Sequence, residues 1–535
     1  MASNPAVGQV VDPSAQGSSR QASSGPASSG LAPSGLESSS AGTPTADPAG
    51  AKPSVWCFGE ATRAHVVVDA SAYYTLMREA MLNAQHRIML IGWDFDTRIA
   101  LKSHRRGEGK RKRGDPPEDL GDFIVWLTRR NPRLEVRVLK WNFGALKMFL
   151  RGAMIMHMWR WWWSRQIDFK LDSAHPLGCS HHQKIVVIDD CFAVCGGIDM
   201  TGDRWDTPEH IEADPRRRRP GGQPYGPWHD CTMMMEGEVA GRLAEYGRER
   251  WQQAGGEAMA PCPPREGTPW PAALDAEFRE VEIGIARTRS QYKDIPETRE
   301  IEALFLEQIA RAKRFIYAEN QYFTSRKIAE AIALRLGEPD PPEFVIVSPQ
   351  TADGWLEQKA MDGARIRLLH SIRTADHAQR FSLWNPYTSG GTPIYVHAKL
   401  TIVDDEIIRV GSANMNNRSM GLDSECDVFI DCARPENHGC GDVITRMRHA
   451  LLAEHAGIEP DTVAGLLDTH GSMAAMLDAV PKDGKCIRRF ELRELTEAEE
   501  ALADSEALDP EHPEEMLKFY NRRGLFRGRL LRRPK

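Results

Sequence analysis

Apolar and polar residues follow one another along the chain with two periods, one typical of helices and one typical of strands. Apolar residues recur at helical spacing over Ser71 to Ala84 and over Thr298 to Ala312. Short apolar runs of strand length cover Arg87 to Trp93, Leu134 to Trp141 and Glu343 to Val347. Helices and strands that alternate in this way predict an α/β fold, in which helices cover the faces of a sheet.

The same succession of elements occurs twice, which indicates an internal repeat. Each round has a helix, a strand, a second helix and strand, and then a segment HxKxxxxD followed by a turn that contains glycine. The two segments begin at His182 and His397, which are 397 − 182 = 215 residues apart. This spacing suits one α/β domain, so we expect two copies of one domain that meet near Arg287 to Asp294.

The two ends of the chain differ in composition from the repeat. Met1 to Pro53 is dominated by Ser, Gly, Ala and Pro and holds too few large apolar side chains to offset the entropy lost on folding. The expected organisation is a disordered tail over 1–53, repeat domains over 54–287 and 288–485, and a helical, basic tail over 486–535.

Charge and hydropathy narrow the class of protein only slightly. The chain has 68 Lys and Arg residues and 75 Asp and Glu residues, so attraction to nucleic acid or to anionic membrane must come from local patches. No apolar run reaches the length of about 18 residues that spans a bilayer, and Met1 to Arg20 lacks the pattern of a secretory signal. A cytoplasmic or peripheral membrane protein is expected, with secretion that needs no signal peptide as an alternative.

The ten cysteines match neither a disulfide framework nor a pair of zinc-binding CxxC motifs. The separations of Cys191 from Cys195 and of Cys432 from Cys440 illustrate this. Reduced, mostly buried thiols are therefore expected, and neither a structural metal nor a cofactor.

The two HxKxxxxD segments carry the candidate chemistry. Residues i and i+2 of a strand face the same way, so Lys184 should project with His182, and Lys399 with His397. Cleavage of a phosphodiester needs a nucleophile, a proton donor and positive charge around the transition state. Two histidine–lysine pairs supply all three without a metal.

A turn of small residues follows each segment at the same offset, Gly196 to Asp199 in the first copy and Gly411 to Asn414 in the second. Small residues would let donor groups approach an anion closely. Ser412 and Asn414, together with the lysines, would hold the non-bridging oxygens of a phosphate.

Further blocks surround these motifs, namely Arg204-Trp205-Asp206-Thr207, Pro227-Trp228-His229-Asp230, Glu319-Asn320-Gln321-Tyr322-Phe323 and Gly411 to Met420. Together with the motifs they resemble the phospholipase D superfamily, and its phospholipase branch rather than its nucleases. The resemblance covers most of the chain from Val66 to Asp427. One departure is an arginine-rich insert over Asp214 to Tyr225, which could change substrate access.

The resemblance implies two similar α/β/α sandwich domains related by a pseudo-twofold axis, with the active site at their interface. It implies that His182 is the nucleophile and that His397 is the general acid, which later activates water. It also implies that Glu425 orients His397 and that Asp206 is the counterpart for His182. The expected catalytic residues are His182, Lys184, His397, Lys399, Asp189 and Asp404, and the expected substrate-binding residues are Ser412, Asn414, Asp199, Glu425 and Asp206. The two motif aspartates lie past their strands, which favours a structural role for them.

The expected function is that of a phospholipase D that hydrolyses glycerophospholipids, with phosphatidylcholine as the preferred substrate, to phosphatidate and an alcohol, and that transfers the phosphatidyl group to other alcohols. The alternatives are a phosphatidyltransferase such as a cardiolipin or phosphatidylserine synthase, a superfamily nuclease, and a non-catalytic lipid-binding effector. The expected partners are a phospholipid and a membrane surface, and not nucleic acid. The oligomeric state stays open.

Three segments could contact a membrane. They are the basic cluster within Lys102 to Arg113, the basic and apolar Arg522 to Lys535, and the tryptophans 159, 161, 162 and 163. The alternatives are a solvated loop for the first segment and core packing for the tryptophans.

Overall fold

The computed structural model describes residues 53–101, 114–142, 153–351, 355–494 and 509–510, with the backbone alone over 153–155 and 355–360. The predicted disordered tail apart from Pro53 and the basic loop at 102–113 lie outside the described residues. So do residues 495–508 and 511–535 of the predicted helical, basic tail, which include the basic segment 522–535. No helix that the structure describes is long and apolar enough to cross a membrane. All ten cysteines are described, and all are free thiols.

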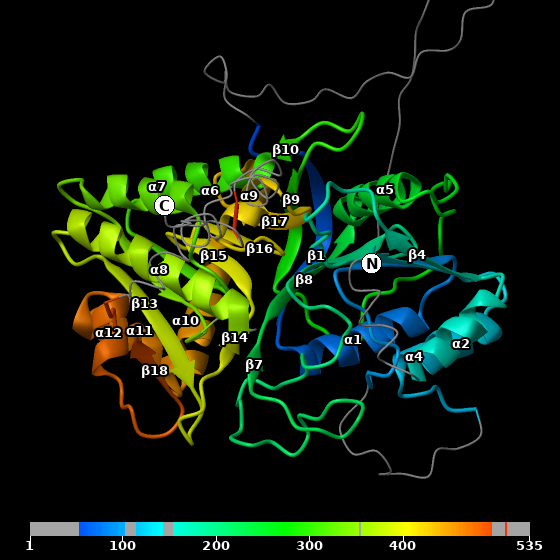
Figure 1. Cartoon of the computed structure of the whole chain (residues 1–535), viewed down its shortest axis with the longest axis horizontal. Coiled ribbons are helices and arrows are strands. Elements are labelled where there is room, and N and C mark those ends of the chain that lie inside the picture. The colour runs from blue at the N-terminus through cyan, green and yellow to red at the C-terminus, as the bar shows by residue number, and fades with distance from the viewer. Residues whose placement is uncertain (1–52, 102–113, 143–152, 352–354, 495–508, 511–535) are drawn as a thin grey trace, which may run out of the picture. The chain divides into compact units, whose positions relative to one another are not determined.

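A sheet of sixteen strands runs through the part of the chain that the structure describes (Figure 1). The first half supplies, from the centre outward, β1 (Cys57–Val68), β8 (Cys231–Gly237), β6 (Phe192–Gly196), β5 (Ile185–Ile188), β2 (Arg87–Gly92), β3 (Glu135–Trp141) and β4 (Ile167–Asp172). The second half supplies β9 (Phe278–Arg289), β17 (Glu425–Asp431), β16 (Ile407–Gly411), β15 (Lys399–Val403), β11 (Phe315–Asn320), β12 (Glu343–Val347), β13 (Phe381–Tyr387) and β18 (Cys486–Arg489), and β10 (Thr298–Arg299) pairs with β9.

The two halves share one pattern of strand pairing. Three strands of each half are parallel, β2, β3 and β4 in the first half and β11, β12 and β13 in the second, and the strands between them and the centre of the sheet pair antiparallel. In the second half β18 adds an antiparallel strand at the edge, beside β13. The halves join where β1 pairs antiparallel with β9, which is its counterpart. The expected boundary after residue 287 falls inside β9, so we propose that the second repeat begins at Phe278.

Helices cover both faces of the sheet, which confirms the expected α/β/α layers. The first half carries α1 (Ala70–Leu82), α2 (Leu120–Arg130), α4 (Ala153–Trp162) and α5 (Glu238–Gln253). The second half carries α6 (Glu300–Arg311), α7 (Arg326–Leu336), α8 (Trp355–Ala375), the short α9 (Asn417–Gly421), a 3-10 turn (Pro435–Asn437), α10 (Gly441–Ala456), α11 (Pro460–His470) and α12 (Met473–Ala479). Figure 1 shows α6, α7 and α8 on one side of the second-half strands and α10, α11 and α12 on the other.

The alternation of side chains along β2 shows how these layers form. Ile88 and Leu90 pack into the apolar core beneath α1 and α2, whereas Met89 and Ile91 pack into the core beneath α5. Side chains of a strand alternate between faces, so a strand that is apolar at every position is buried on both sides.

The motif aspartates hold the sheet together at the strand ends opposite the motif histidines. The Asp189 carboxylate accepts hydrogen bonds of 2.7–2.8 Å from the backbone N–H groups of Gln85 to Arg87, where β2 begins. The Asp404 carboxylate accepts bonds of the same length from Lys313 to Phe315, where β11 begins. Grouping these aspartates with the catalytic residues was therefore wrong, since their carboxylates are fully used in connecting strands.

Candidate active site

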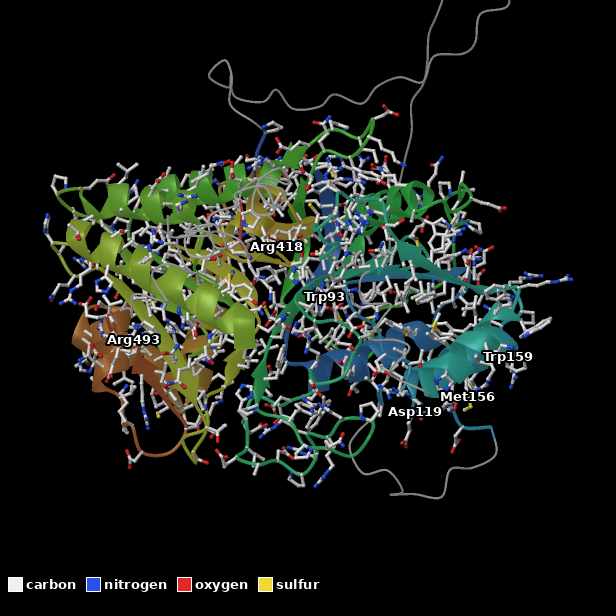
Figure 2. The ribbon with its side chains drawn as sticks, in the orientation of Figure 1. Trp93, Asp119, Met156, Trp159, Arg418 and Arg493 are labelled. Carbon is white, nitrogen blue, oxygen red and sulfur yellow. The ribbon has the colours of Figure 1, made fainter. Side chains whose placement is uncertain are left out.

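His182 and His397 line one cavity of about 410 Å³ between the two halves. Trp93 and Arg418, which also line it, lie near the middle of the molecule in Figure 2. The other described residues that line the cavity are Trp141, Ser180, Arg204, Trp228, Gln321, Tyr322, Tyr395, Asn414, Asn416, Ser419, Asp423 and Glu425. The internal repeat thus brings its two motif histidines into one site.

The carboxylate that orients His182 comes from the second half of the chain. Nδ1 of His182 lies 3.1 Å from each carboxylate oxygen of Glu425, the first residue of β17. The backbone N–H of His182 also donates to the carbonyl oxygen of Ser424 at 2.9 Å. The expectation that Glu425 orients His397 was wrong, because this backbone pairing across the halves places Glu425 beside His182.

A matching contact holds His397, and its carboxylate comes from the first half. Nδ1 of His397 lies 2.7 Å from Oδ2 of Asp230. The backbone N–H of His397 donates to the carbonyl of His229 at 2.7 Å, next to a short parallel pairing of β14 (Tyr395–Val396) with β7 (Trp228–His229). Asp230 belongs to one of the blocks that carry the resemblance, but no role was predicted for it from the sequence. Asp230 lies just before β8, as Glu425 lies at the start of the counterpart strand β17. This shared position was the signal that could have identified Asp230.

Asp206 lies outside the cavity, and its prediction as a site residue was wrong. It is fully buried and accepts hydrogen bonds from Arg217 Nη1 at 3.0 Å and from the backbone N–H of Trp228 at 2.9 Å, and its Oδ2 lies 3.0 Å from Nδ1 of His210. Asp206 therefore supports the segment that carries Trp228.

Each motif lysine folds back onto its own histidine. Lys184 Nζ donates to the carbonyl oxygen of His182 at 2.6 Å and lies 3.3 Å from Oδ2 of Asp199. Lys399 Nζ donates to the carbonyl of His397 and to Oε1 of Gln321, the latter at 3.0 Å. The predicted pairing of His with Lys is thus present, and Asp199 positions a lysine and is not among the described residues that line the cavity.

Ser412 and Asn414 occupy different places. Ser412 is fully buried, and its hydroxyl donates to Glu425 Oε2 at 2.5 Å, behind the carboxylate that holds His182. Asn414 lines the cavity, and its side-chain oxygen has no hydrogen-bond partner within the described part of the chain. Only Asn414 of this pair is placed to contact a ligand.

The motif glycines make room for carboxylates. A Cβ atom at Gly197 would collide with the Asp230 carboxylate, and one at Gly411 would collide with the Asp427 carboxylate. Asp427 Oδ1 accepts hydrogen bonds from the backbone N–H groups of Ser412 and Ala413 at 3.0 and 3.1 Å. These glycines therefore leave space for the carboxylates that shape the site. The sequence had instead predicted that small residues here let donor groups approach an anion.

Burial and like charges set the protonation of the cavity. Burial, and then the charges of Lys184 and Lys399, lower the pKa of His182 well below its ordinary value, and burial and Lys399 do the same to the pKa of His397. Burial also lowers the pKa of Lys399 to about 7 and raises the pKa of Glu425 to about 8. Neutral imidazoles have a free lone pair, which a nucleophile requires.

Aromatic rings form two walls of the cavity. Trp93 stacks on Trp141 with ring centroids 6.0 Å apart, and Trp228 stacks on Tyr395 at 4.6 Å. The Arg204 guanidinium lies over the Trp228 ring, 4.2 Å from its centroid. The cavity therefore combines cationic groups near the histidines with flat aromatic faces.

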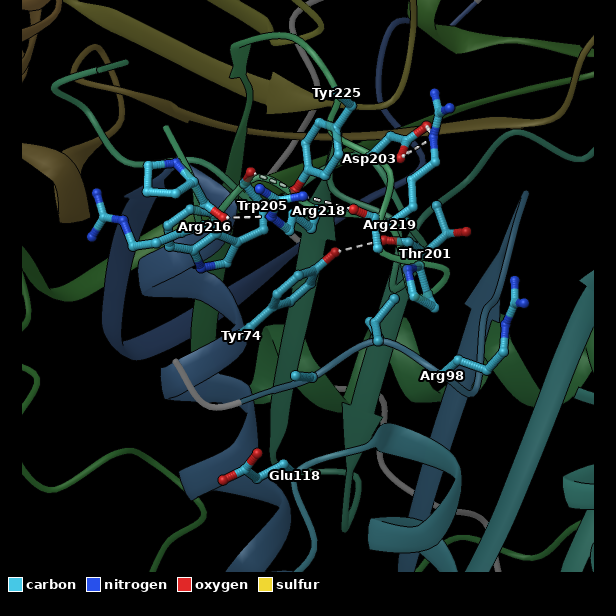
Figure 3. Close-up of a pocket in the computed structure, with 16 residues that line it drawn as sticks. Tyr74, Arg98, Glu118, Thr201, Asp203, Trp205, Arg216, Arg218, Arg219 and Tyr225 are labelled. Carbon is cyan, nitrogen blue, oxygen red and sulfur yellow. Dashed lines mark hydrogen bonds and ion pairs between the residues drawn. The ribbon is translucent and has the colours of Figure 1, made fainter. Parts of the chain in front are cut away.

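The arginine-rich insert lines a separate cavity of about 210 Å³ (Figure 3). Neither motif histidine is among the described residues around it. Two arginines of the insert pair with carboxylates, Arg216 with Asp214 and Arg219 with Asp203, and Arg98, which also lines this cavity, pairs with Asp96. Much of the positive charge around this cavity is thus neutralised by neighbouring carboxylates.

Comparison with known proteins gives a consistent set of relatives. A family model described as Phospholipase D matches residues 375–502. Phospholipase D alpha 1 of Carica papaya is 24% identical over an alignment that covers 72% of this chain and 64% of the papaya protein. Phospholipase D1 of Saccharomyces cerevisiae is 28% identical over 53% of this chain and 22% of the yeast protein. The chain thus spans less than two thirds of the length of either relative.

Among solved structures, the phosphatidylserine synthase of Haemophilus influenzae Rd KW20 aligns with a TM-score of 0.49 and 13% sequence identity. The alignment covers 79% of this chain and 97% of that protein.

The contact between Asp230 and His397 predicts the effect of removing one negative charge. Asp230→Asn keeps the shape of the side chain but no longer favours a proton on Nδ1 of His397, so kcat should fall by about 10²–10⁴-fold with little change in KM. Steady-state kinetics on a phosphodiester substrate measure this. The exposed Asp275→Asn is the matched control and should keep full activity. A kcat for Asp230→Asn equal to that of the control would contradict the assignment.

The lowered pKa of Lys399 predicts a basic limb in the pH profile. Its ammonium group must be protonated to attract an anionic phosphodiester, so kcat/KM should fall as pH rises through about 7, by about tenfold per pH unit. In Lys399→Arg the guanidinium stays charged, and the limb should move to higher pH even if the maximal rate drops. A wild-type profile that stays flat up to about pH 9 would show that this protonation is not required.

Proposed function

Because the chain belongs to the phospholipase D superfamily, we propose that it cleaves the phosphodiester bond of glycerophospholipids through a covalent intermediate on His182. The observation that carries this proposal is the pair of histidines in one cavity, each held at Nδ1 by a carboxylate from the other half. A carboxylate at Nδ1 fixes the tautomer and leaves Nε2 of each ring available for chemistry.

The reaction then proceeds in two displacements. Nε2 of His182 attacks phosphorus, the bond from phosphorus to the headgroup oxygen breaks, and His397 gives a proton to that oxygen as the alcohol leaves. In the second step His397 takes a proton from water, the water oxygen attacks phosphorus, and the bond to His182 breaks to release phosphatidate. Another alcohol in place of water would yield a transphosphatidylation product.

The charges around the histidines favour these two reaction steps. Burial, and then the charges of Lys184 and Lys399, lower the imidazole pKa values in the free protein. A bound phosphodiester carries one negative charge, which offsets these cations and favours a proton on His397. The same lysines then stabilise the charge that develops on the phosphoryl oxygens.

The aromatic walls favour a choline headgroup. Trp93, Trp141 and Tyr395 line the cavity beside the histidines, whereas the ring of Trp228 is covered by Tyr395 and Arg204. Quaternary ammonium groups bind to aromatic faces by cation–π attraction. Phosphatidylcholine is therefore the proposed substrate, and serine or a lipid as acceptor alcohol is the alternative.

A group of exposed apolar side chains supports action at a membrane surface. The exposed fractions are 66% for Trp159, 86% for Trp162 and 73% for Trp163, whereas Trp161 is 1% exposed and belongs to the core. Figure 2 shows Trp159 and Met156 along α4, well apart from Trp93. Tryptophans with one apolar and one polar edge favour the interface between lipid and water. We propose that this α4 surface contacts the bilayer.

The first experiment measures headgroup release from a panel of phospholipids, with and without ethanol. Wild type should release choline from phosphatidylcholine and form phosphatidylethanol, and His182→Ala and His397→Ala should each lose both products, by about 10³-fold or more. Folding of each variant is checked by its melting temperature. A folded wild-type protein that turns over none of the lipids would rule out the proposal and favour the nuclease or the non-catalytic alternative.

The α4 surface predicts a defect that appears only with bilayers. Changing Trp162 and Trp163 together to serine should lower turnover of phosphatidylcholine vesicles by about tenfold or more, since each tenfold corresponds to about 1.4 kcal/mol of lost binding. Turnover of a soluble short-chain phosphatidylcholine should stay unchanged. Leu334→Ser on α7 is the control, because that side chain is also exposed, at 77%. An equal loss with both forms of substrate would count against a membrane role.

A further inference from the structure

A buried cluster of two histidines and two carboxylates lies next to the active site and takes no part in the proposed chemistry. Its members are Asp69 just before α1, His210 in the loop that follows Asp206, His229 in β7 and Glu454 in α10. The side chains of Asp69, His210 and His229 are 0% exposed and that of Glu454 is 11% exposed. The cluster joins residues that lie far apart in the sequence and come from both halves.

The distances within the cluster suit a common metal ion. Nδ1 of His229 and Nε2 of His210 lie 2.8 and 3.1 Å from the same oxygen of Glu454. The same nitrogens lie 3.4 and 3.6 Å from the two carboxylate oxygens of Asp69. Tetrahedral zinc with bonds of about 2.0–2.2 Å to nitrogen and oxygen separates neighbouring ligand atoms by about 3.4 Å. The observed separations lie around this value.

The outer nitrogens of both imidazoles face carboxylates. Nδ1 of His210 lies 3.0 Å from Oδ2 of Asp206, and Nε2 of His229 lies 2.8 Å from Oε2 of Glu319. The other oxygen of Glu319 is occupied by His455 at 2.9 Å and by the hydroxyl of Tyr317 at 2.6 Å. Histidines that bind metal characteristically give their second ring nitrogen to a carboxylate, which turns the other nitrogen toward the ion.

Oδ2 of Asp69 faces the cluster and has no hydrogen-bond partner among the described residues, and its side chain is fully buried. Nδ1 of the fully buried His229 is not aligned for a hydrogen bond within the described part of the chain either, although it lies 2.8 Å from Oε1 of Glu454. A buried polar atom without a partner costs free energy, so natural proteins rarely leave one unpaired. Asp69 also has a positive φ of 62°, a backbone conformation that is unfavourable for a residue other than glycine.

We propose that Asp69, His210, His229 and Glu454 bind one divalent transition-metal ion, with zinc as the ion that fits this set of two nitrogen and two oxygen ligands. Imidazole and carboxylate ligands in tetrahedral geometry are typical of zinc. The ion is structural, because its ligands connect α1 and β7 of the first half to α10 of the second. It also anchors His229, whose neighbour Asp230 holds His397. The proposed ion differs from the expectation of a protein without a metal, and its binding does not depend on the proposed substrate.

Metal content of the purified full-length chain tests the proposal. After expression with added zinc and exhaustive dialysis, elemental analysis should find about one zinc ion per chain. Asp69→Asn and Glu454→Gln each remove one anionic ligand at nearly constant shape, and each should lower the zinc content by about tenfold or more. His65→Gln is the control, because His65 pairs with Glu277 outside the cluster, and it should keep its zinc.

A second measurement keeps the test decisive if a variant fails to fold. A strong zinc chelator should lower the melting temperature of the wild type, and zinc but not magnesium should restore it. Cobalt(II) in place of zinc should give the intense visible absorption of a tetrahedral site. A wild type without bound metal, whose melting temperature does not respond to zinc, would overturn the proposal and leave the cluster as a network of protonated histidines and carboxylates. Zinc retained in full by folded Asp69→Asn and Glu454→Gln would also overturn it.

Discussion

The site depends on two contacts in which a carboxylate of one half of the chain holds a histidine of the other half. Glu425 of the second half holds His182 of the first, and Asp230 of the first half holds His397 of the second. Each contact is accompanied by a backbone hydrogen bond across the same boundary, from His182 to Ser424 and from His397 to His229. Neither half alone has an oriented histidine, so the site forms only when β1 and β9 join the halves into one sheet.

The same arrangement concentrates buried charge, and the surrounding structure compensates for it. Buried lysines donate to the carbonyl groups of their own histidines, and the glycines of the motifs leave space in which carboxylates accept backbone hydrogen bonds. Lys184, Lys399 and Arg204 place positive charge beside the histidines, and this charge is suited to attract an anionic phosphodiester. The proposed chemistry and the pKa shifts therefore both reflect positive charge close to the histidines.

The cluster around His229 lies behind the cavity and supports two of the residues that form it. His229 lies between Trp228, a wall of the cavity, and Asp230, the partner of His397. Its ring is held by Glu319 on one side and faces Glu454 on the other. Any group that fixes this ring therefore also fixes the backbone from which the Asp230 carboxylate reaches the active site.

The sequence by itself determined the α/β class, the internal repeat, the strands β2, β3 and β12 to within about two residues, and the two pairs of histidine and lysine. These features are local, since they follow from periodicity and from residues a few positions apart. The resemblance to the phospholipase D superfamily was also visible in the sequence, because the blocks around the histidines are contiguous in the chain.

Only the tertiary structure decided which carboxylate serves which histidine. Glu425 is 243 residues from His182, and Asp230 is 167 residues from His397, so no local pattern relates them. In the structure Asp189, Asp404 and Asp206, which the sequence placed in the site, are not among the described residues that line the cavity. Among the tryptophans, which share one short segment and one composition, it separated a buried ring from the exposed ones. Pairing and burial depend on how strands cross between the halves, and that information belongs to the fold and not to any single stretch of sequence.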